Sequence, residues 1–413
     1  GSEMCIRDRI YAVEHFGYGG PDGLKTFVRE ANRRGIAVFL DTVHNHYETY
    51  DQDVWDFDTG WGPGIYFFPN ANGMCCTPWG QRPRYSEDRV RSFIIDNINM
   101  WVDEYHIGGF RWDSVGSMRE YDAGGGMYLP VDYGDFLLDE INNNQLRGNE
   151  NRDHVISIAE DKPGDLGFHG EWMHGFKDAL VDVVTQPLDR SRDMNALRNA
   201  IDGTGHFRVL FAESHDTAGD LNGGSRLTAK IDGANPHSLF ARKRSTLAAA
   251  VVLSAPGKPM LFMGQELMEE EAFSDGSPLD WNYTNTYAGV NRLYRDMIRL
   301  RRNLDGVSLG MTGPNVSFVQ VDNTNKMLAY HRWGAGTDDQ VLVVMNFADK
   351  HWSNYDLHGL PLDGNWFVHV NSDWIEYGSD FGNQGSRMVT VNGGTGTFSL
   401  APYSFLILCL LYT

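Results

Sequence analysis

The sequence predicts an α/β protein in two parts: a barrel of parallel strands and helices, followed by an all-β sandwich. Two observations predict this. Up to about residue 304, helical apolar spacing alternates with short continuous apolar runs, as in parallel strands joined by helical crossovers. Beyond that point, short alternating strands are separated by Gly, Asn and Asp turns, which is typical of an antiparallel sandwich. Six strands expected before residue 265 favour a (β/α) barrel over a small open sheet.

The helices of the first part are predicted from apolar residues spaced three and four apart. The first opens at Pro21 and ends before Gly35, with Leu24, Phe27, Val28 and Ala31 on its apolar face. The second follows a Ser86 cap and carries Val90, Phe93, Ile94, Trp101 and Tyr105. Later helices are expected over about residues 238–254 and 290–298. Continuous apolar runs predict buried strands at residues 36–40, 155–159, 179–184, 209–212 and 259–263. A further short strand is expected after the Gly108-Gly109 break, ending at Asp113.

The second part is expected to be a β-sandwich over residues 305–408, after a barrel over residues 10–304. Its predicted strands are 317–321, 327–333, 341–347, 366–370, 388–391 and 397–408. Residues 1–9 and 409–413 continue no neighbouring pattern and resemble translated adapter read-through. We therefore expect both ends to be non-native and leave them out of the predicted fold.

Composition excludes several classes of partner. The net charge of −20 disfavours nucleic acid and anionic membranes, which are bound by basic surfaces. No apolar run of about 18 residues is present, so no membrane span is predicted. The 4 cysteines show neither zinc-site spacing nor a disulfide framework, which indicates a reducing cytoplasm. The sequence does not predict an oligomeric state.

Polar residues follow four of the predicted strands, at the ends where barrel enzymes place their catalytic groups. A charged group beside a buried strand is costly unless it is paired or functional. Four such groups at equivalent places therefore indicate one converging site. The four stretches are Asp41-Thr42-Val43-His44-Asn45-His46, Arg111-Trp112-Asp113, Glu160-Asp161 and Glu213-Ser214-His215-Asp216.

These groups fit the cleavage of a glycosidic bond with retention. That reaction needs a carboxylate nucleophile and a protonated carboxylic acid roughly 5 Å apart. A third carboxylate can stabilise the positively charged transition state. Arg111 lies two residues before Asp113, so both side chains share one strand face, where Arg111 can orient that carboxylate. Spacing alone does not assign the roles.

In order, the four stretches resemble the four conserved regions of glycoside hydrolase family 13, the α-amylase family. The resemblance covers about residues 10–408. It implies that Asp113 is the nucleophile, Glu160 the general acid/base and Asp216 the transition-state stabiliser. It implies that Arg111 orients Asp113, and that the remaining three residues bind the sugar ring: Asp41, His46 and His215. It implies an α-glucan substrate and no cofactor.

Within that family, the chain resembles the 1,4-α-glucan branching enzymes of glycogen synthesis. Ala159-Glu160-Asp161, Ala212–Asp216 and the stretch from Ala255 to Glu266 are similar to their motifs. Thr217-Ala218-Gly219 departs from the pattern after the fourth region, so hydrolysis of the amylase type remains an alternative. The family's barrel has eight strands and Asp41 would end the third. We therefore expect the first two strands to be absent, leaving exposed edges and weak or no activity for this stretch by itself.

Several local assignments remain open. Asp161 competes with Glu160, and Glu213 competes with Asp216. Motif position favours Glu160 and Asp216, which leaves Glu213 as a candidate for an acceptor subsite. Asn45 could ligate calcium, but the resemblance to branching enzymes predicts no metal.

Two other classes of protein compete with the sugar-cleaving enzyme. His44 and His46 form an HxH pair that can bind a metal in amidohydrolase-like enzymes. A non-catalytic relative that only binds glucan or a partner is the other alternative, although all three carboxylates are present.

The loop over residues 47–85 is rich in aromatic residues, whose faces suit sugar stacking. Phe67 and Phe68 are expected to form the loop's own core. Either contact with substrate or a structural role is expected for Trp55, Trp61 and Trp79. Cys75 and Cys76 are expected to be incidental loop residues.

Overall fold

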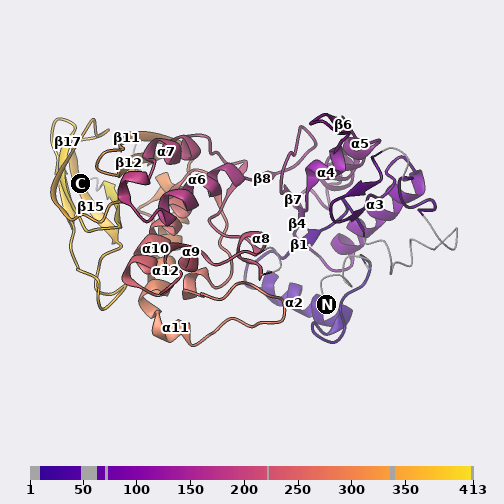
Figure 1. Ribbon diagram of the computed structural model, residues 1–413, viewed down its shortest axis with the longest axis horizontal. Coiled ribbons are helices and arrows are strands. Elements are labelled where there is room, and N and C mark those ends of the chain that lie inside the picture. Colours follow the sequence, from indigo (N-terminus) through magenta and orange to yellow (C-terminus); the bar gives the residue numbers. More distant parts are fainter. Residues whose placement is uncertain (1–9, 48–62, 70–72, 221–222, 335–339, 411–413) are drawn as a thin grey trace. The chain divides into compact units, whose positions relative to one another are not determined.

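The computed structural model describes residues 10–47, 63–69, 73–220, 223–334 and 340–410. The chain forms two compact units, Gly1–Trp172 and Met173–Thr413, and each is described by itself. Figure 1 shows the elements of both units along the chain.

The first unit is built on parallel strands. Their order is β1 (Phe39–Thr42), β4 (Gly109–Trp112), β7 (Ile156–Ala159) and β8 (Gly170–Trp172). Strands β4 and β7 confirm predicted strands. Strand β1 begins at Phe39 rather than at residue 36, and the expectation that it is buried on both faces was wrong, because Ile36 and Phe39 are exposed. Strand β8 was not predicted, because its three residues contain no apolar run. In the described residues β1 pairs only with β4, so it forms a sheet edge, as expected of this sheet.

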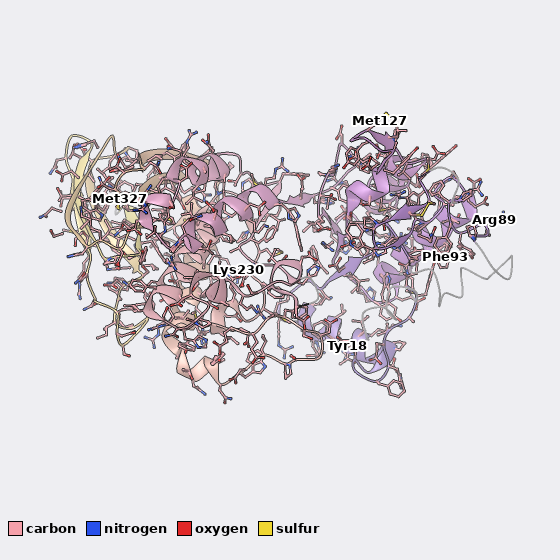
Figure 2. The ribbon with its side chains drawn as sticks, in the orientation of Figure 1. Tyr18, Arg89, Phe93, Met127, Lys230 and Met327 are labelled. Carbon is pink, nitrogen blue, oxygen red and sulfur yellow. A yellow bond between two sulfur atoms is a disulfide. The ribbon has the colours of Figure 1, made fainter. Side chains whose placement is uncertain are left out.

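Helices and hairpins complete the first unit. Its helices are α2 (Gly20–Asn32), α3 (Asp88–Asp103), α4 (Val115–Arg119), α5 (Gly134–Asp139) and a π-helical turn (Glu140–Arg147). Its hairpins are β2 (Cys76–Thr77) with β3 (Gly80–Gln81), and β5 (Glu120–Asp122) with β6 (Tyr128–Pro130). Met127, labelled in Figure 2, lies in the turn of the second hairpin, and its side chain is exposed.

Two details of the predicted helices were wrong. Phe27, placed on the apolar face of α2, is 61% exposed, while Val28 beside it is buried. The residue before α3 is Glu87 rather than Ser86, and no side chain caps the helix. The buried face of α3 is nevertheless the predicted one, since Val90, Ile94 and Trp101 lie in the core of the unit.

The second unit opens with helices. They are α6 (His174–Thr185), α7 (Met194–Asp202), α8 (His215–Ala218), α9 (Leu227–Ile231), α10 (Leu239–Ser254), α11 (Tyr283–Thr286) and α12 (Ala288–Arg301). Two short parallel strands, β9 (Arg208–Leu210) and β10 (Lys258–Pro259), lie among them. Short helical turns add Asp189–Ser191, Gln265–Leu267 and Leu309–Thr312. The predicted helices over 238–254 and 290–298 are confirmed as α10 and α12.

The predicted strand over residues 179–184 was wrong, because this run lies inside α6. The buried residues Phe176, Leu180, Val183 and Val184 are spaced as on one face of a helix. A short apolar run does not by itself distinguish a buried strand from a buried helix.

The chain ends in the predicted β-sandwich. The strands are β11 (Asn315–Asp322), β12 (Met327–Trp333), β13 (Gln340–Asn346), β14 (Trp352–His358), β15 (Gly364–Asn371), β16 (Met388–Val391), β17 (Thr395–Leu400) and β18 (Ser404–Leu410). One antiparallel sheet has the order β11-β12-β13-β18-β15-β16, and β14 pairs with β17. Leu342 and Val344 of the large sheet share a core with Leu357 and Phe398 of the small one.

The structure corrects two strands near the carboxyl end. The predicted strand over 397–408 is two strands, β17 and β18, with Tyr403 between them at a φ of 45°. The proposed foreign tail begins too early, since Cys409 and Leu410 continue β18 and pair with Val341 and Trp366. Cys409 is buried there, so its side chain belongs to the core. Strand β14 was missed, because four of its seven residues are polar.

The predicted domain boundary near residue 305 is not a break between compact units. Residues of α10 and α12 share one core with strands β12, β13 and β18, including Val251, Met297, Tyr330, Val343 and Ile407. The boundary between barrel and sandwich therefore stays a prediction. In the described part of the chain, no helix has the length and apolarity needed to cross a membrane.

Candidate active site

The first three polar stretches lie at aligned strand ends in the first unit. In the parallel register, Asp41 of β1 is opposite Arg111 of β4. The backbone N–H of Asp113 donates to the carbonyl of Thr42 at 3.0 Å, and that of Glu160 donates to the carbonyl of Trp112 at 3.0 Å. Each residue therefore leaves its strand at the same edge of the sheet, as the sequence predicted.

The guanidinium of Arg111 joins three carboxylates. Its Nη1 lies 2.8 Å from Oδ1 of Asp41 and 2.8 Å from Oδ1 of Asp113. Its Nη2 lies 2.8 Å from Oε2 of Glu160. The indole of Trp172 on β8 covers the guanidinium, whose carbon lies 4.5 Å from the ring centroid. Four residues proposed for the site are thus brought together around one cation: Asp41, Arg111, Asp113 and Glu160.

Arg111 stays charged in this environment. Burial by itself would lower the pKa of its guanidinium, but Asp41, Glu160 and Asp113 together raise that pKa above its usual value. A permanently charged, planar group can hold several carboxylates in fixed directions. Arg111 thus contacts all three carboxylates, and its orienting role stays a prediction.

Asn45 contacts the proposed nucleophile directly. Its Nδ2 donates to the backbone carbonyl of Asp113 at 2.6 Å and to Oδ2 of Asp113 at 2.7 Å. Oδ1 of Asp113 is held by Arg111, so both carboxylate oxygens have a partner. We identify Asn45 as a positioning residue, a role that the sequence analysis did not assign.

The structure separates Glu160 from Asp161. Oε2 of Glu160 accepts from the backbone N–H of Ser114 at 2.7 Å, beside Arg111. Oδ1 of Asp161 instead accepts from the backbone N–H of Gly116 in α4, at 2.9 Å. Asp161 therefore supports the segment that follows Asp113, whereas Glu160 lies among the clustered charges. This arrangement favours Glu160 as the acid/base.

His44 and His46 have different surroundings. His44 is buried against Trp112, with 5.8 Å between ring centroids, and its Nδ1 lies 2.9 Å from the hydroxyl of Tyr47. His46 contacts Asn45 and the indole of Trp79. No group of three or more His, Cys, Asp and Glu side chains in the described residues is arranged to hold a metal ion. The alternative of an HxH metal site gains no support there.

The buried imidazole of His44 predicts that the fold loses stability in acid. Its burial lowers its pKa from 6.5 to about 4. As the pH falls below 6.5, the unfolded chain takes up a proton that the folded chain does not, so the free energy of unfolding should fall. For a shift of this size, the proton uptake lowers the free energy of unfolding by roughly 3 kcal/mol between pH 6.5 and pH 4.

We therefore expect His44→Gln to lose less stability than the wild type between pH 6.5 and 4. Urea denaturation at several pH values measures the difference between the two proteins, which cancels the groups that they share. Equal losses for both proteins would contradict this assignment.

The fourth polar stretch lies in the second unit, after β9. Glu213 is 2% exposed, and its carboxylate accepts from the backbone N–H of Leu227, the first residue of α9. Burial raises the pKa of Glu213. Such a buried carboxylate suits an internal support of α9, not an acceptor subsite open to sugar. His215 and Asp216 begin α8, both partly exposed, with His215 Nε2 at 3.4 Å from Asp216 Oδ1.

The structure tests some of the predictions for the loop over residues 47–85. Phe67 and Phe68 are buried, as predicted, and Cys75 and Cys76 are joined in a disulfide, so they are not incidental. Trp55 and Trp61 lie outside the described residues. The sequence analysis did not predict that the indole of Trp172 covers Arg111. Neither strand β8 nor this contact leaves a pattern in the sequence.

Comparison with known proteins identifies relatives for both parts of the chain. The family described as alpha amylase, C-terminal all-beta domain, matches residues 318–410. A 1,4-alpha-glucan branching enzyme of Rhizobium etli is 27% identical over 420 residues, covering 95% of this chain and 55% of that protein. A branching enzyme of Geobacillus stearothermophilus is 27% identical, covering 94% and 61%. The chain thus spans about half the length of the curated relatives it matches.

Solved structures share the fold. An alpha-amylase from Geobacillus thermoleovorans, complexed with acarbose, has a TM-score of 0.72 at 16% identity, covering 98% of this chain and 83% of that one. A pullulanase from Anoxybacillus, complexed with maltotetraose, has a TM-score of 0.66 at 20% identity, covering 95% and 56%. The fold is therefore a TIM-type (β/α) barrel with a C-terminal β-sandwich, as predicted.

Together, the barrel-type strands, the C-terminal all-β domain and the strand-end carboxylates make the chain similar to proteins of the α-amylase class, glycoside hydrolase family 13. Among the curated proteins of that class, it is similar to the 1,4-α-glucan branching enzymes.

Proposed function

We propose that the protein catalyses glycosyl transfer on α-1,4-glucan with retention, and that it is a branching enzyme forming α-1,6 links. The observation that carries this proposal is the single guanidinium of Arg111, shared by Asp113 and Glu160 at 2.8 Å each. A nucleophile and an acid/base held beside each other are what retention requires. The similarity to branching enzymes supports the choice of reaction.

In the proposed reaction, a carboxylate oxygen of Asp113 attacks the anomeric carbon while Glu160 gives its proton to the departing glycosidic oxygen. A covalent glycosyl–Asp113 ester results. Glu160 then takes the proton of a glucan 6-hydroxyl, whose oxygen attacks the anomeric carbon and releases Asp113. Asp216 is proposed to stabilise the positive charge that develops on the sugar in both steps, and Asp41, His46 and His215 to bind the ring.

The ion pair between Arg111 and Glu160 adds a requirement to this mechanism. A carboxylate that contacts a guanidinium is favoured in its ionised form. An acid catalyst must instead carry a proton. In the proposed mechanism, loss of the contact between Oε2 of Glu160 and Nη2 of Arg111 therefore favours the protonated acid.

Hydrolysis of the amylase type is the second candidate. It shares every step up to the ester and differs in the acceptor, which is water. The departure at Thr217-Ala218-Gly219 from the branching-enzyme pattern favours it. A relative that binds glucan without turnover is the candidate from another class.

The proposed partner is an α-glucan polysaccharide or oligosaccharide, and the proposed location is the cytoplasm, where glycogen is made. Neither a cofactor nor a metal has a part in the proposed steps. A net charge of −20 is the observation against nucleic acid and anionic membranes as partners.

The products formed from amylose test this proposal. We expect the protein, expressed with all the sequence that its gene encodes, to produce anomeric α-1,6 signals in proton NMR without a matching rise in reducing ends. New reducing ends without α-1,6 signals would contradict branching and favour hydrolysis. Binding of amylose without either product would favour the non-catalytic candidate.

A further inference from the structure

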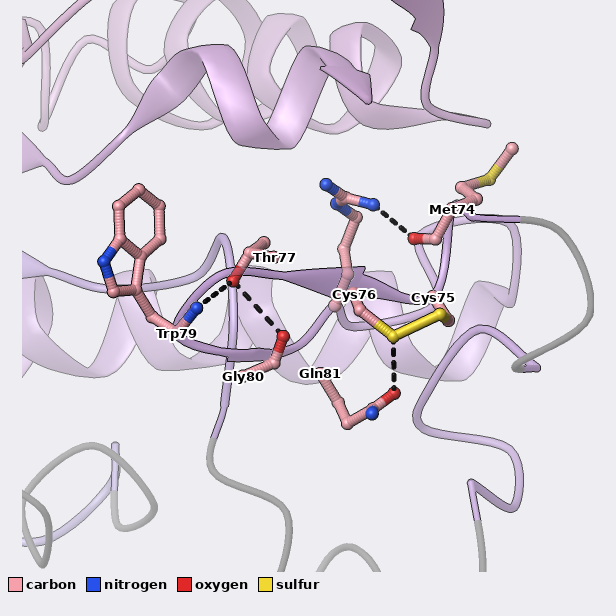
Figure 3. The surroundings of a disulfide bond; sticks show 8 residues. Met74, Cys75, Cys76, Thr77, Trp79, Gly80 and Gln81 are labelled. Atoms are coloured by element: carbon pink, nitrogen blue, oxygen red, sulfur yellow. Dashed lines mark hydrogen bonds between the residues drawn. A yellow bond between two sulfur atoms is a disulfide. The ribbon is translucent and has the colours of Figure 1, made fainter. Parts of the chain in front are cut away.

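The β2–β3 hairpin of the first unit carries two unusual features, which Figure 3 shows together. A disulfide joins the adjacent residues Cys75 and Cys76 at its start. The indole of Trp79 extends from its turn, where Nε1 and the ring face away from the hairpin backbone. Neither feature has a role in the steps described so far.

Trp79 lies beside the sugar-binding candidate His46. The two ring centroids are 5.8 Å apart, with an angle of 37° between the ring planes. The indole is nevertheless 55% exposed, so contact with the protein covers less than half of the side chain. An exposed, rigid aromatic face next to a binding residue is suited to stack on the apolar face of a sugar ring.

The backbone fixes the hairpin to the strand-end segment that carries the site. Tyr47 N–H donates to the carbonyl of Gln81 at 2.8 Å, and Gln81 N–H donates back at 2.9 Å. At Gly80 the two segments approach so closely that an added Cβ would lie 2.4 Å from the carbonyl oxygen of Tyr47. The hairpin therefore moves with the segment that contains His46.

Hydrogen bonds of Arg82 link the disulfide to the segment that follows the proposed nucleophile. The carbonyl of Cys75 accepts from the backbone N–H of Arg82 at 2.7 Å. The buried guanidinium of Arg82 donates to the carbonyl of Met74, and its Nε donates to the carbonyl of Ser117 at 2.9 Å. Ser117 belongs to α4, which begins at Val115, two residues after Asp113. The cysteine pair thus lies between the Trp79 hairpin and the segment after the proposed nucleophile.

Joining adjacent cysteines closes a small ring that removes torsional freedom from the residues that lead into β2. Cys76 Sγ lies 3.7 Å from Oε1 of Gln81, across the hairpin. In the disulfide this sulfur has no hydrogen, whereas in the reduced pair it is a thiol that can donate to this oxygen. Reduction therefore changes both the stiffness of the hairpin and a contact within it.

We propose that Trp79 is a stacking residue for a glucose unit of the bound glucan, and that the Cys75–Cys76 disulfide positions it, so that glucan affinity depends on the redox state of this pair. The inference rests on the proposed function and adds a residue and a control to it. The reducing partner is a dithiol. Its thiolate attacks one cysteine sulfur, which forms a mixed disulfide and releases the other cysteine as a thiolate. Its second thiol then attacks the dithiol's own sulfur in that mixed disulfide and releases the first cysteine, so the Cys pair gains two protons and two electrons as the dithiol becomes a disulfide. Disulfides in reducing compartments are commonly transient and regulatory.

Titration calorimetry with maltohexaose tests the stacking residue. All proteins carry Asp113→Asn, so that turnover does not obscure binding. We expect Trp79→Ala to raise Kd about tenfold, consistent with loss of one aromatic stacking contact, and Trp79→Phe to retain most of the affinity. Tyr128→Ala is the matched control, an exposed aromatic residue on the other hairpin of the unit, and should leave Kd unchanged.

The redox arm uses the same titration before and after treatment with excess dithiothreitol. Mass spectrometry after iodoacetamide labelling should find two additional labels on Cys75 and Cys76 once the protein is reduced. Reduction should raise Kd, and Cys75→Ser/Cys76→Ser should show the weaker Kd with and without reductant. Cys409→Ser, at a buried cysteine of β18, should keep the response.

The two arms separate the failures. Unchanged Kd for Trp79→Ala overturns the stacking role, and unchanged Kd on reduction, or labelled cysteines before reduction, overturns the redox control. Either result leaves the proposed function standing if the Asp113→Asn protein binds maltohexaose. Absence of binding by that protein overturns the inference together with the proposed function.

Discussion

Replacement of Asp113 by Asn should lower glucan turnover at least about 10³-fold, because it removes the nucleophile that forms the covalent intermediate. The amide is nearly the same size and its one oxygen can still accept from Arg111, while Asn45 can still donate to the backbone carbonyl of residue 113, so the fold should survive. Release of reducing ends and formation of α-1,6 signals should fall together, since both products need the same ester.

Asp132→Asn is the matched control for this loss. It makes the same chemical change at an exposed aspartate of the first unit. It should retain wild-type turnover. Substantial turnover in Asp113→Asn, with its melting temperature unchanged, would mean that another carboxylate is the nucleophile.

Replacement of Arg111 by Leu should be the most destabilising change at the site. The guanidinium is largely buried, and its loss leaves three carboxylates facing each other without a cation. Removing one partner of a fully buried pair costs about 3–5 kcal/mol; we expect about 2 kcal/mol here, because Asp41 and the other carboxylates are partly exposed. Turnover should also fall to the level of Asp113→Asn, as the carboxylates lose their common support.

Arg111→Lys provides the control for charge. The ammonium keeps a positive charge but cannot reach three carboxylates with a planar fork. We expect it to restore most of the stability and little of the turnover. Urea denaturation at pH 7 measures the first and product formation the second. An Arg111→Leu protein as stable as the wild type would show that the cluster does not depend on this cation.

The strand-end site was predictable because strand polarity determines where a residue lies. Asp41, Asp113 and Glu160 each lie at the end of a predicted strand, and the carboxyl ends of parallel strands meet at one edge. Which oxygen contacts which nitrogen was not predictable, since it depends on side-chain geometry. The adjacent carboxylates Glu160 and Asp161 show this. Motif position favours Glu160 as the acid/base, but only the structure shows that Glu160 contacts Arg111 while Asp161 contacts the backbone of Gly116.

Other features were predicted wrongly or not at all, because their sequence pattern is short and ambiguous. The apolar run at residues 179–184 is compatible with a strand and with a helix. The spacing of the buried residues in α6 shows that it is a helix. Strand β8 has three residues, yet it supplies Trp172, which covers Arg111. The Cys75–Cys76 disulfide was dismissed because frameworks are recognised by spacing, and adjacent cysteines have none.

The polar stretch of the second unit offers two carboxylates for the transition-state stabiliser, Glu213 and Asp216. The sequence spacing allows either residue in this role, but their burial differs. Glu213 supports the start of α9 from inside the unit, while Asp216 is partly exposed at the start of α8. The proposal that Asp216 stabilises the transition state rests on its motif and on this exposure.

Trapping of the covalent intermediate tests the central claim most directly. A fluorinated α-glucosyl fluoride, which forms the ester readily and releases it slowly, is incubated with the protein, and the protein is then digested and analysed by mass spectrometry. The account predicts one glucosyl adduct on the peptide that contains Asp113, and none in Asp113→Asn. An adduct on Asp41 or Glu160 instead, or turnover of glucan without any trapped ester, would contradict it.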